Sequence, residues 1–498
     1  MNVNPITRLD YPDPDVIRVE DTYYMVSTTM HFMPGCEILQ SFDLVHWEHV
    51  TYVYETLDHT DAQQLKSGQN IYGQGMWAAS LRYHEGRFYI CFVANDTRKT
   101  YLYTSEKIDG PWKKQLIEGF YHDGSLLFDE DGRSYIVYGN DEIWITELNE
   151  DLTAPKKDGL HRLLVSDHKN PELGYEGSHI QKINGYYYIF LIHSLRDRWM
   201  RTEACFYSDS LEGEFTGGDV LCDDRGYCGQ GVAQGGIVDT PDGKWYAMLF
   251  QDSGAVGRIP ILVPVTWKDH FPVFGQSGHV PEEIEVHSTR PGYIYQPLVG
   301  SDDFCNGLLP RWQFNHDPDP RYYHLDALQG TYTITTREVC TELTQAVNTL
   351  TQRMSYPSCA AEVTVDASAL KEGDVAGLCA LQGCYAAVGI TKHHGKYEVL
   401  MLDKKEDGIL DMTEGTVVES HQMDFRLEAD FCNMKDEARC YYRVNKGDWL
   451  PIGTVHKLYF KLDHFTGCRF GLFCYAAEET GGSACFRDFK YYDVDEIL

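Results

Sequence analysis

A short β-hairpin pattern recurs five times in roughly the first 275 residues, and this repeat constrains the fold more than any other feature of the sequence. In the fourth copy, Glu176 opens a half-apolar strand, the dipeptide Asn184-Gly185 follows, and an aromatic strand returns. An Asn-Gly or Asp-Gly dipeptide between two such strands indicates a hairpin with a two-residue turn. The five copies are opened by Asp13, Trp77, Asp123, Glu176 and Gln234.

The spacing of these openings predicts a β-propeller. Successive openings lie between 46 residues (77 to 123) and 64 residues (13 to 77) apart. A period near 50 residues with several short strands in each unit is typical of propeller blades. Five units predict a five-bladed propeller over residues 1–298. Because the first strand of each blade lines the central axis, the five opening residues should converge at one end of it, and three of them are carboxylates.

Residues 299–498 are predicted to form a second domain, a β-sandwich. The hairpin pattern breaks between Gln276 and Gly300, which indicates a linker across the surface. Short alternating runs then dominate up to the C-terminal region, as in residues 360–365, 397–402 and 470–475. Short strands in this number favour a sandwich. The whole chain is therefore predicted to be all-β, with few helices.

Composition narrows the possible partners. The 498 residues contain 43 Lys and Arg against 75 Asp and Glu, a formal net charge of −32. Such an excess of negative charge argues against nucleic acids and anionic membranes as partners. No apolar run approaches the length of a membrane-spanning helix, and the first residues lack the basic and apolar regions of a signal peptide.

The cysteines favour a reducing compartment. The sequence has 15 of them, an odd number, with no Cys-x-x-Cys pair. We interpret them as free thiols in a cytoplasmic protein, rather than as disulfides or a metal cluster. A homo-oligomer is left open by these observations.

The three opening carboxylates suggest hydrolytic chemistry. Asp13, Asp123 and Glu176 would face one another at the end of the propeller axis. Glycoside hydrolysis needs one protonated carboxyl group to donate to the leaving oxygen and one carboxylate to activate water or to attack directly. Crowding by the other two carboxylates predicts a raised pKa for Glu176. The alternative is that these acids satisfy backbone donors around the axis, which would leave a non-catalytic sugar-binding propeller.

Ordered motifs along the whole chain resemble glycoside hydrolase family 43. They are Tyr11-Pro12-Asp13-Pro14-Asp15, Ser41-Phe42-Asp43-Leu44-Val45-His46-Trp47, Trp77-Ala78, His122-Asp123-Gly124-Ser125 and Tyr175-Glu176-Gly177. Phe304, Gly307-Leu308 and Trp312-Gln313 look like the start of the C-terminal sandwich of that family's β-xylosidases. The resemblance implies a five-bladed propeller followed by a concanavalin-like β-sandwich.

The resemblance also implies an activity. It suggests an exo-acting glycosidase that releases xylose or arabinose from short xylo- or arabino-oligosaccharides with inversion. On this basis Asp13 is the general base, Glu176 the general acid, and Asp123 the residue that tunes and orients the acid. β-D-Xylosidase and α-L-arabinofuranosidase activity both stay open. Five-bladed glycosidases of another specificity, those acting on fructose polymers, typically carry Arg-Asp-Pro and Glu-Cys where this chain has His122-Asp123-Gly124 and Glu176-Gly177.

Four further residues are candidates for substrate binding. Trp77 opens a blade without a charge and is expected to form a stacking wall for a sugar, with axial packing as the alternative. The resemblance assigns Arg258 to substrate hydroxyls and the acidic cluster, and Phe32 to another apolar wall. Phe465 looks like the sandwich residue that closes the pocket in two-domain relatives, with an ordinary core aromatic as the alternative.

No cofactor is expected. Many members of the family carry a histidine at the position of Gln234, where it helps to hold calcium or another divalent ion on the propeller axis. Glutamine offers one neutral oxygen, which is a poor sole ligand for a hard cation. We therefore predict no metal-ligating residue, and a divalent ion on the axis is doubtful.

Overall fold

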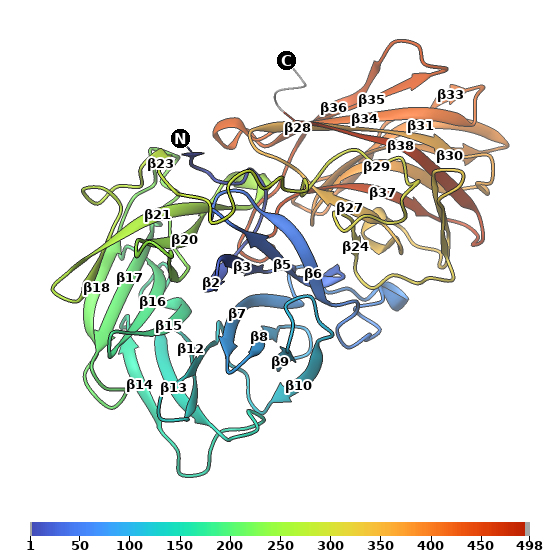
Figure 1. The fold of residues 1–498 in the computed structure, drawn as a ribbon. Coiled ribbons are helices and arrows are strands. Elements are labelled where there is room, and N and C mark those ends of the chain that lie inside the picture. The colour runs from blue at the N-terminus through green and yellow to red at the C-terminus, as the bar shows by residue number, and fades with distance from the viewer. Residues whose placement is uncertain (1, 494–498) are drawn as a thin grey trace.

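The computed structural model describes residues 2–493, which form two all-β domains side by side (Figure 1). The N-terminal half closes into a ring of five sheets around a central axis, and the C-terminal part forms a two-sheet sandwich beside it. The predicted all-β class, with a five-bladed propeller and a concanavalin-like sandwich, is confirmed. The helices of the described residues are single 3-10 turns: η1 Lys66–Gly68, η2 Gly254–Val256, η3 Leu343–Gln345 and η4 Cys432–Met434.

Each blade is a four-stranded antiparallel sheet that is continuous in sequence except for one short inserted strand. Blade I contains β2 Asp15–Val19, β3 Thr22–Ser27, β5 Gly35–Ser41 and β6 Glu48–Tyr54. Blade II contains β7 Met76–His84, β8 Arg87–Ala94, β9 Lys99–Ser105 and β10 Lys113–Ile117. Blade III contains β11 Ser125–Phe128, β12 Ser134–Asn140, β13 Glu142–Leu148 and β14 His161–Ser166. Blade IV contains β15 Glu176–Ile183, β16 Tyr186–Ser194, β17 Arg201–Ser208 and β18 Thr216–Leu221. Blade V contains β19 Ile237–Asp239, β20 Trp245–Asp252, β21 Arg258–Lys268 and β22 Phe271–Phe274.

The turn dipeptides bring the first two strands of a blade together. In blade IV, Asn184 and Gly185 both have positive φ, 51° and 85°. Two consecutive residues with positive φ match the right-handed twist of the flanking strands. The apolar side chains of neighbouring blades pack face to face, and one such cluster, with Tyr23 from blade I and Leu262 from blade V, closes the ring. The first strand of every blade is thereby held along the axis.

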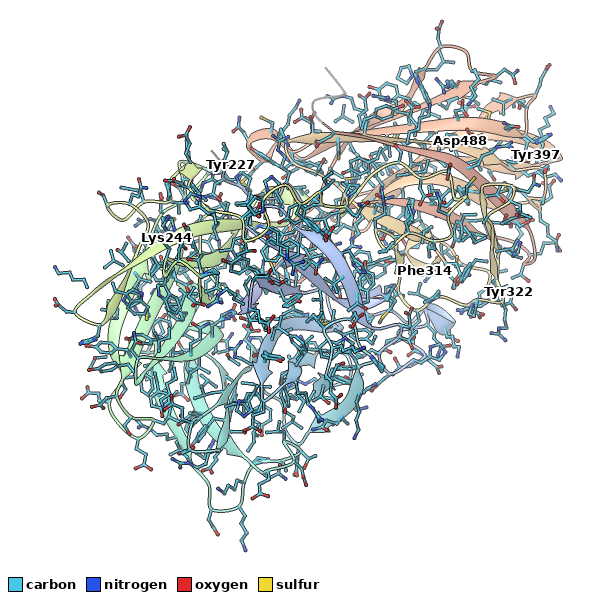
Figure 2. All side chains as sticks on the ribbon, in the orientation of Figure 1. Tyr227, Lys244, Phe314, Tyr322, Tyr397 and Asp488 are labelled. Atoms are coloured by element: carbon cyan, nitrogen blue, oxygen red, sulfur yellow. The ribbon has the colours of Figure 1, made fainter. Side chains whose placement is uncertain are left out.

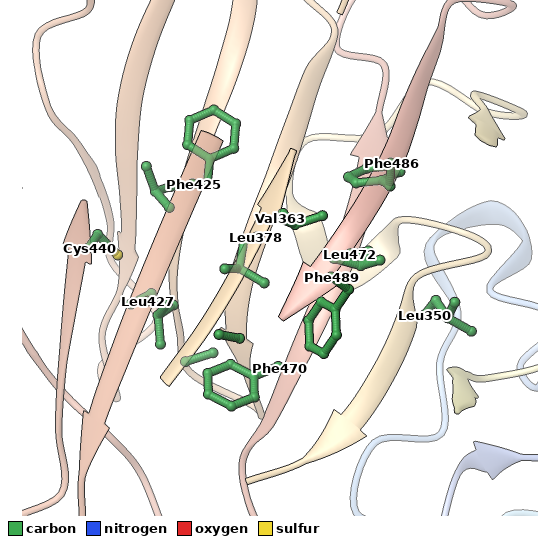
Figure 3. Close-up of a cluster of buried hydrophobic side chains, with 14 of the residues drawn as sticks. Leu350, Val363, Leu378, Phe425, Leu427, Cys440, Phe470, Leu472, Phe486 and Phe489 are labelled. Carbon is green, nitrogen blue, oxygen red and sulfur yellow. The ribbon is translucent and has the colours of Figure 1, made fainter. Parts of the chain in front are cut away.

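The sandwich packs two antiparallel sheets against each other. One sheet contains β32 Leu410–Met412, β31 Lys396–Lys404, β30 Tyr385–His393, β29 Val375–Leu381, β37 Arg469–Tyr475, β27 Leu350–Arg353 and β24 Gln313–Asn315, with β33 Thr416–Val418 on β31. The other contains β25 Tyr323–Asp326, β26 Thr331–Thr335, β38 Ser483–Asp493, β28 Ser358–Asp366, β34 Gln422–Asp430, β35 Glu437–Val444 and β36 Leu450–Lys457. Side chains such as Leu378, Phe425 and Phe470 fill the space between the sheets (Figure 3).

The two domains share a strand. β4 Phe32–Met33 lies between β3 and β5 of blade I in the sequence, yet it pairs with β24 of the sandwich, where Met33 is opposite Phe314. Phe314 is labelled on the sandwich in Figure 2. Arg353 of the sandwich also forms a buried ion pair of 2.8 Å with Glu37 of blade I. The sandwich is therefore attached to the blade that carries Asp13.

The predicted linker follows the surface of the propeller. It includes β23 Glu283–Ile284, which pairs with β1 Asn2–Val3. The predicted second domain ends at residue 498, and its last residues, 494–498, lie outside the described part of the chain, as does residue 1 of the first domain. Between residues 2 and 493, no helix is both long and apolar enough to cross a membrane.

Candidate active site

The backbone at the start of each blade turns the opening residues toward the axis. In blades I, III and V, the openings Asp13, Asp123 and Gln234 have positive φ (52°, 48° and 62°) just before the first strand. In blades II and IV the opening lies within the strand, and a register shift follows it, between Met76 and Ala79 or between Glu176 and His179. A bulge redirects side chains in the same way that a strained φ does.

Asp13 is held by two donors at the buried end of the site. Its Oδ2 accepts a hydrogen bond from Thr28 Oγ1 at 2.6 Å, and its Oδ1 accepts one from Arg258 Nη1 at 2.6 Å. Arg258 also donates from Nε to Asp252 at 3.2 Å, and Asp252 pairs with Arg201 at 2.8 Å. Because Arg258 begins β21 of blade V, this network fixes the carboxylate of blade I against the neighbouring blade.

Asp123 and Glu176 form a second group on blades III and IV. Asp123 Oδ2 accepts the backbone N–H of Gly177 at 2.8 Å, and Glu176 Oε2 accepts from Asn140 Nδ2 at 2.6 Å. The ring of His122 lies between the two carboxylates, with Nε2 at 3.6 Å from Asp123 Oδ2 and 3.5 Å from Glu176 Oε2. The three groups are therefore close enough to influence one another's ionisation.

The charges in this group have opposite effects on its members. Burial raises the pKa of Asp123 to about 6; His122 opposes this, while the negative charges of Glu176 and Asp13 add to it. Burial disfavours the cation of His122, but the charge of Asp123 and the hydrogen bond and charge of Glu176 outweigh it and raise the pKa of His122 to about 9. His122 is therefore a cation at neutral pH.

The predicted raised pKa of Glu176 was wrong for the protein without substrate. Burial does push the pKa of Glu176 upward, but the hydrogen bond and positive charge of His122, together with Arg201 and Arg258, hold it below its ordinary value. The prediction considered the neighbouring carboxylates and left out the cation that directly precedes Asp123 in the sequence. Of the two carboxyl groups beside His122, Asp123 is thus the one with the raised pKa.

Aromatic side chains join the two carboxylate groups. Phe465, from the sandwich, makes an edge-on contact with Trp77 at a centroid distance of 5.2 Å, and the Arg258 guanidinium lies 4.0 Å from the centre of its ring. Trp77 in turn contacts His122 at 6.0 Å. Asp13, Arg258, Phe465, Trp77 and the His122 group thus form one continuous set of contacts, which brings six of the seven predicted site residues together.

Phe32 is the predicted residue that lies elsewhere. Its ring packs against His31 at 4.3 Å and under the Arg469 guanidinium at 3.5 Å, in strand β4 at the domain boundary. Its pairing with Asn315 of the sandwich accounts for this position. The preceding Met30 is nearer the site, since its backbone bridges to Met76 and its sulfur accepts from Thr466, next to Phe465.

Gln234, where a divalent ion on the axis was judged doubtful, precedes the first strand of blade V. The Gln234 side chain packs against Gly177, where an added Cβ would meet it at 2.6 Å. Further along the axis, the Arg82 guanidinium donates to Asp15 at 2.7 Å, to Ser125 at 2.7 Å and to the carbonyl of Leu126 at 2.8 Å. The guanidinium of Arg82, in blade II, therefore joins blades I and III at this level of the axis.

One group among the described residues has the spacing to hold a metal ion. His122, Asp123 and Glu176 present ligand atoms within 4.8 Å of one another. Each of these atoms has a protein partner, however, since Gly177 donates to Asp123 and Asn140 donates to Glu176. These hydrogen bonds and charges hold the three side chains in place.

Several residues of the site gave no signal in the sequence. Asn140 and Asp252 contact Glu176 and Arg258 from the ends of the second strands of their blades, and Thr28 contacts Asp13 from the position just after the second strand of blade I. His122 was visible beside Asp123, and its position one residue before a blade opening was the one signal that could have indicated its role.

This arrangement can support acid–base chemistry on a neutral ligand. Asp13 and Glu176 belong to blades I and IV, which are not neighbours in the ring, and their donors come from different blades. Two carboxyl groups separated in this way can act on opposite sides of one reacting atom. The aromatic rings of Trp77 and Phe465 offer apolar faces on which a sugar ring can stack.

Comparison with known proteins agrees with this geometry. Residues 3–272 match the protein family described as "Glycosyl hydrolases family 43". Residues 301–492 match the family described as "Beta xylosidase C-terminal Concanavalin A-like domain". A β-xylosidase of Formosa agariphila is 26% identical over 99% of this chain and 89% of its own length. A xylosidase/arabinosidase of Butyrivibrio fibrisolvens is 24% identical over 99% of both.

A solved structure is also similar. The bifunctional GH43-CE protein of Bacteroides eggerthii has a TM-score of 0.91 and 42% sequence identity over 99% of this chain. The present chain spans 63% of that protein's length. With the family pattern covering more than half of the sequence, the chain belongs to glycosyl hydrolases family 43.

Proposed function

We propose that this protein is an exo-acting, inverting glycosidase that releases xylose or arabinose from the ends of short xylo- or arabino-oligosaccharides. The observation that carries the proposal is the placement of Asp13 and Glu176 on non-adjacent blades, each with its own donors, in a chain of this family. The names of the relatives, β-xylosidase and xylosidase/arabinosidase, support the two sugars.

In this mechanism Asp13 acts as the general base. A water molecule between Asp13 and the sugar attacks the anomeric carbon, and Asp13 accepts its proton. Glu176 gives a proton to the leaving oxygen as the glycosidic bond breaks. The product is a hemiacetal of inverted configuration, and the next turnover begins when Asp13 loses its proton and Glu176 regains one.

Glu176 must be protonated to act as the acid, although His122 favours its ionised form in the free protein. A neutral sugar that covers Glu176 displaces water from it, and loss of water disfavours the charged form of a carboxyl group. We propose that substrate binding in this way raises the pKa of Glu176 at the moment when a proton is needed. Asp123, with Oδ2 on Gly177 N–H, orients the backbone beside the acid.

Hydrolysis of nitrophenyl glycosides tests the proposed function. We expect release of nitrophenol from the β-D-xyloside or the α-L-arabinofuranoside, and the ratio of the two rates separates the two activities. The assay is run with and without EDTA, because we propose that no metal ion is required, and the two rates should agree. Lack of release from both glycosides would reject the proposal and favour a non-catalytic sugar-binding propeller.

The compartment and partners are part of the proposal. All 15 cysteines are free thiols, and six of those in the sandwich core or its edges, such as Cys379 and Cys468, are buried. Free thiols suit a reducing environment, so we propose that the enzyme acts in the cytoplasm on oligosaccharides that have been taken up. The net charge of −32 supports a neutral sugar as partner rather than a nucleic acid or an anionic membrane.

Phe465→Ala is expected to weaken substrate binding. The ring of Phe465 covers Arg258 and contacts Trp77, so its loss removes an apolar face and opens this side of the site to water. Loss of one aromatic contact of this kind should raise KM by about tenfold, the equivalent of roughly 1.4 kcal/mol. Steady-state kinetics on the better nitrophenyl glycoside measure the effect. Phe473→Ala, in a sandwich cluster that contains no residue of the site, is the control for lost stability, and an unchanged KM in Phe465→Ala would contradict a role in binding.

His122→Gln is expected to move the alkaline limb of the pH profile to higher pH. The His122 cation holds the pKa of Glu176 down, so a neutral amide should let that pKa rise. Glu176 would then stay protonated to higher pH, so kcat/KM on a substrate with a poor leaving group would begin to fall at a higher pH than in the wild type. His161→Gln, on the surface of the same blade, is the matched control and should leave the profile unchanged. A shift of the limb to lower pH would contradict the electrostatic role of His122.

A further inference from the structure

Asp10 is a buried carboxylate three residues before Asp13 that the chemistry described so far does not use. It is 2% exposed. Its Oδ1 accepts the backbone N–H of Arg258 at 2.7 Å, and its Oδ2 accepts the backbone N–H of Gly467 at 2.7 Å. One side chain thus holds a segment of blade V with one oxygen and a loop of the sandwich with the other.

Both of these segments carry residues of the active site. Arg258 donates to Asp13, and Gly467 follows Phe465 by two residues in the loop that crosses from the sandwich. The same two segments are joined by backbone bonds, since Cys468 N–H donates to the Ala255 carbonyl at 2.8 Å. Tyr11, next to Asp10, donates its N–H to the Arg258 carbonyl at 2.9 Å. The Arg258 peptide is therefore held on both sides by residues 10 and 11.

The segments approach so closely that only glycine fits at the contact. A Cβ on Gly257, which has φ 102°, would lie 2.1 Å from Asp10 Oδ1. A Cβ on Gly467 would lie 2.0 Å from the carbonyl oxygen of Val256. With no side chains between them, the two backbones meet at the Asp10 carboxylate, so its position sets the distance between the Arg258 segment and the Phe465 loop.

Burying this carboxylate is costly. Burial raises the pKa of Asp10 to about 6, and the two backbone bonds and the charges of Arg353 and Arg469 offset only part of that effect. Arg353 donates to the main-chain carbonyl of Asp10, at 2.8 Å, and pairs its charge with Glu37. A buried charge is destabilising unless its hydrogen bonds compensate for lost water, so a carboxylate here calls for a reason beyond stability.

We propose that Asp10 is a positioning residue that couples the sandwich domain to the catalytic base. It holds the Arg258 peptide so that the guanidinium meets Asp13, and it holds Gly467 so that Phe465 lies over that same guanidinium. The inference rests on the proposed function, because it assigns Asp10 to the same reaction. It acts through Arg258 and Phe465 and does not itself contact the substrate.

Asp436 provides a matched control. This buried sandwich carboxylate accepts the N–H of Ala255 at 3.0 Å, so it holds the other end of the same turn across the same domain boundary. Burial raises its pKa to about 6 as well. Its hydrogen bond reaches neither Arg258 nor the Phe465 loop. Asp436→Asn therefore removes a comparable interdomain bond and leaves the coupling intact.

The experiment compares Asp10→Asn and Asp10→Ala with Asp436→Asn, using thermal melting and steady-state kinetics on the nitrophenyl glycoside that the wild type hydrolyses. An amide has one acceptor oxygen, so Asp10→Asn keeps one of the two bonds at most. We expect the Asp10 variants to have a lower kcat and a higher KM than the wild type. The combined loss in kcat/KM should be about 100-fold, because a small misplacement of catalytic groups has an effect of this size. Asp436→Asn should lose similar thermal stability and keep kcat/KM close to the wild-type value.

Two results would overturn the coupling. One is a folded Asp10→Asn with wild-type kcat and KM. The other is an Asp436→Asn that loses as much activity as Asp10→Asn at equal thermal stability. If Asp10→Ala does not fold, Gly467→Ala is a second variant, because its Cβ forces the sandwich loop away from Val256, and we expect it to raise KM more than it lowers kcat.

Hydrogen exchange separates failure of the coupling from failure of the proposed function. We expect Asp10→Asn to speed exchange of the Arg258 and Gly467 amides in the intact protein. A wild type with no activity on either glycoside would overturn the proposed function. Unchanged exchange at both amides in Asp10→Asn would overturn the coupling, whatever the activity.

Discussion

Replacing Asp13 with alanine is expected to lower kcat by about 10²- to 10⁴-fold on every substrate, whatever its leaving group. Asp13 is the carboxylate fixed by Thr28 and Arg258, and the attacking water needs a base however easily the leaving group departs. Steady-state kinetics on a nitrophenyl glycoside and on a disaccharide measure the loss.

The structure allows this change without a large effect on folding. Arg258 keeps its ion pair with Asp252, so the variant does not leave the guanidinium without a partner. A thermal melt of Asp13→Ala verifies that the protein is folded. Asp242→Ala, at an exposed turn of blade V, is the matched control and should retain full activity. A folded Asp13→Ala that keeps a tenth or so of the wild-type kcat, far above the range expected for a lost general base, would remove Asp13 from the base role.

Replacing Glu176 with alanine is expected to have an effect that depends on the leaving group. A sugar leaving group needs a proton from Glu176, so hydrolysis of a disaccharide should slow by about 10²- to 10⁴-fold. A dinitrophenolate is a stable anion that departs without protonation, so the loss on its glycoside should be far smaller. The ratio of the two losses, measured by steady-state kinetics, reports on proton donation directly.

The substitution keeps one contact of this acidic group and removes another. His122 would remain beside Asp123, and Asn140 would lose its acceptor on Glu176. Glu172→Ala, an exposed carboxylate just before blade IV, is the matched control and should change neither rate. If Glu176→Ala lost the same factor on both leaving groups, Glu176 could not be the proton donor.

The repeat in the sequence was enough to predict the blades and the convergence of their first residues. Opening residues that recur at each hairpin must lie at one end of the axis, so the sequence alone predicts that Asp13, Asp123 and Glu176 lie together. The positive φ of Asp13 and Asp123 was not predictable in this way, because the sequence around each reads as an ordinary strand start.

The contacts that determine the pKa of Glu176 could not be predicted from the sequence, for a physical reason. His122 and Asn140 act on Glu176 from 54 and 36 residues away, and no spacing rule connects one blade to the next at that level. The direction of the pKa shift of Glu176 was therefore predicted wrongly. Asp10 is a similar case, because its two partners lie 248 and 457 residues along the chain.

Phe32 shows the limit of a prediction from resemblance. Two residues along the chain separate the active site from the domain boundary, because Met30, which precedes β4, contacts Met76 whereas Phe32, in β4, pairs with Asn315. Met30 has a positive φ of 54° and lies outside the strand, so the chain turns between the two residues and a small shift in alignment changes the environment. Phe465 was predicted to reach from the sandwich toward the pocket, and in the structure its ring contacts Trp77 of the propeller.

The anomeric configuration of the first-formed sugar tests the central claim most directly. An inverting site needs carboxyl groups roughly 6.5–9.5 Å apart to admit a water, whereas a retaining site needs about 5–5.5 Å. Asp13 and Glu176 on blades I and IV, with Asp13 as base, require inversion. Proton NMR during the first minutes of hydrolysis, before mutarotation, should show α-xylose from a β-xyloside, or β-arabinose from an α-arabinofuranoside. A first product with the configuration of the substrate would contradict the account.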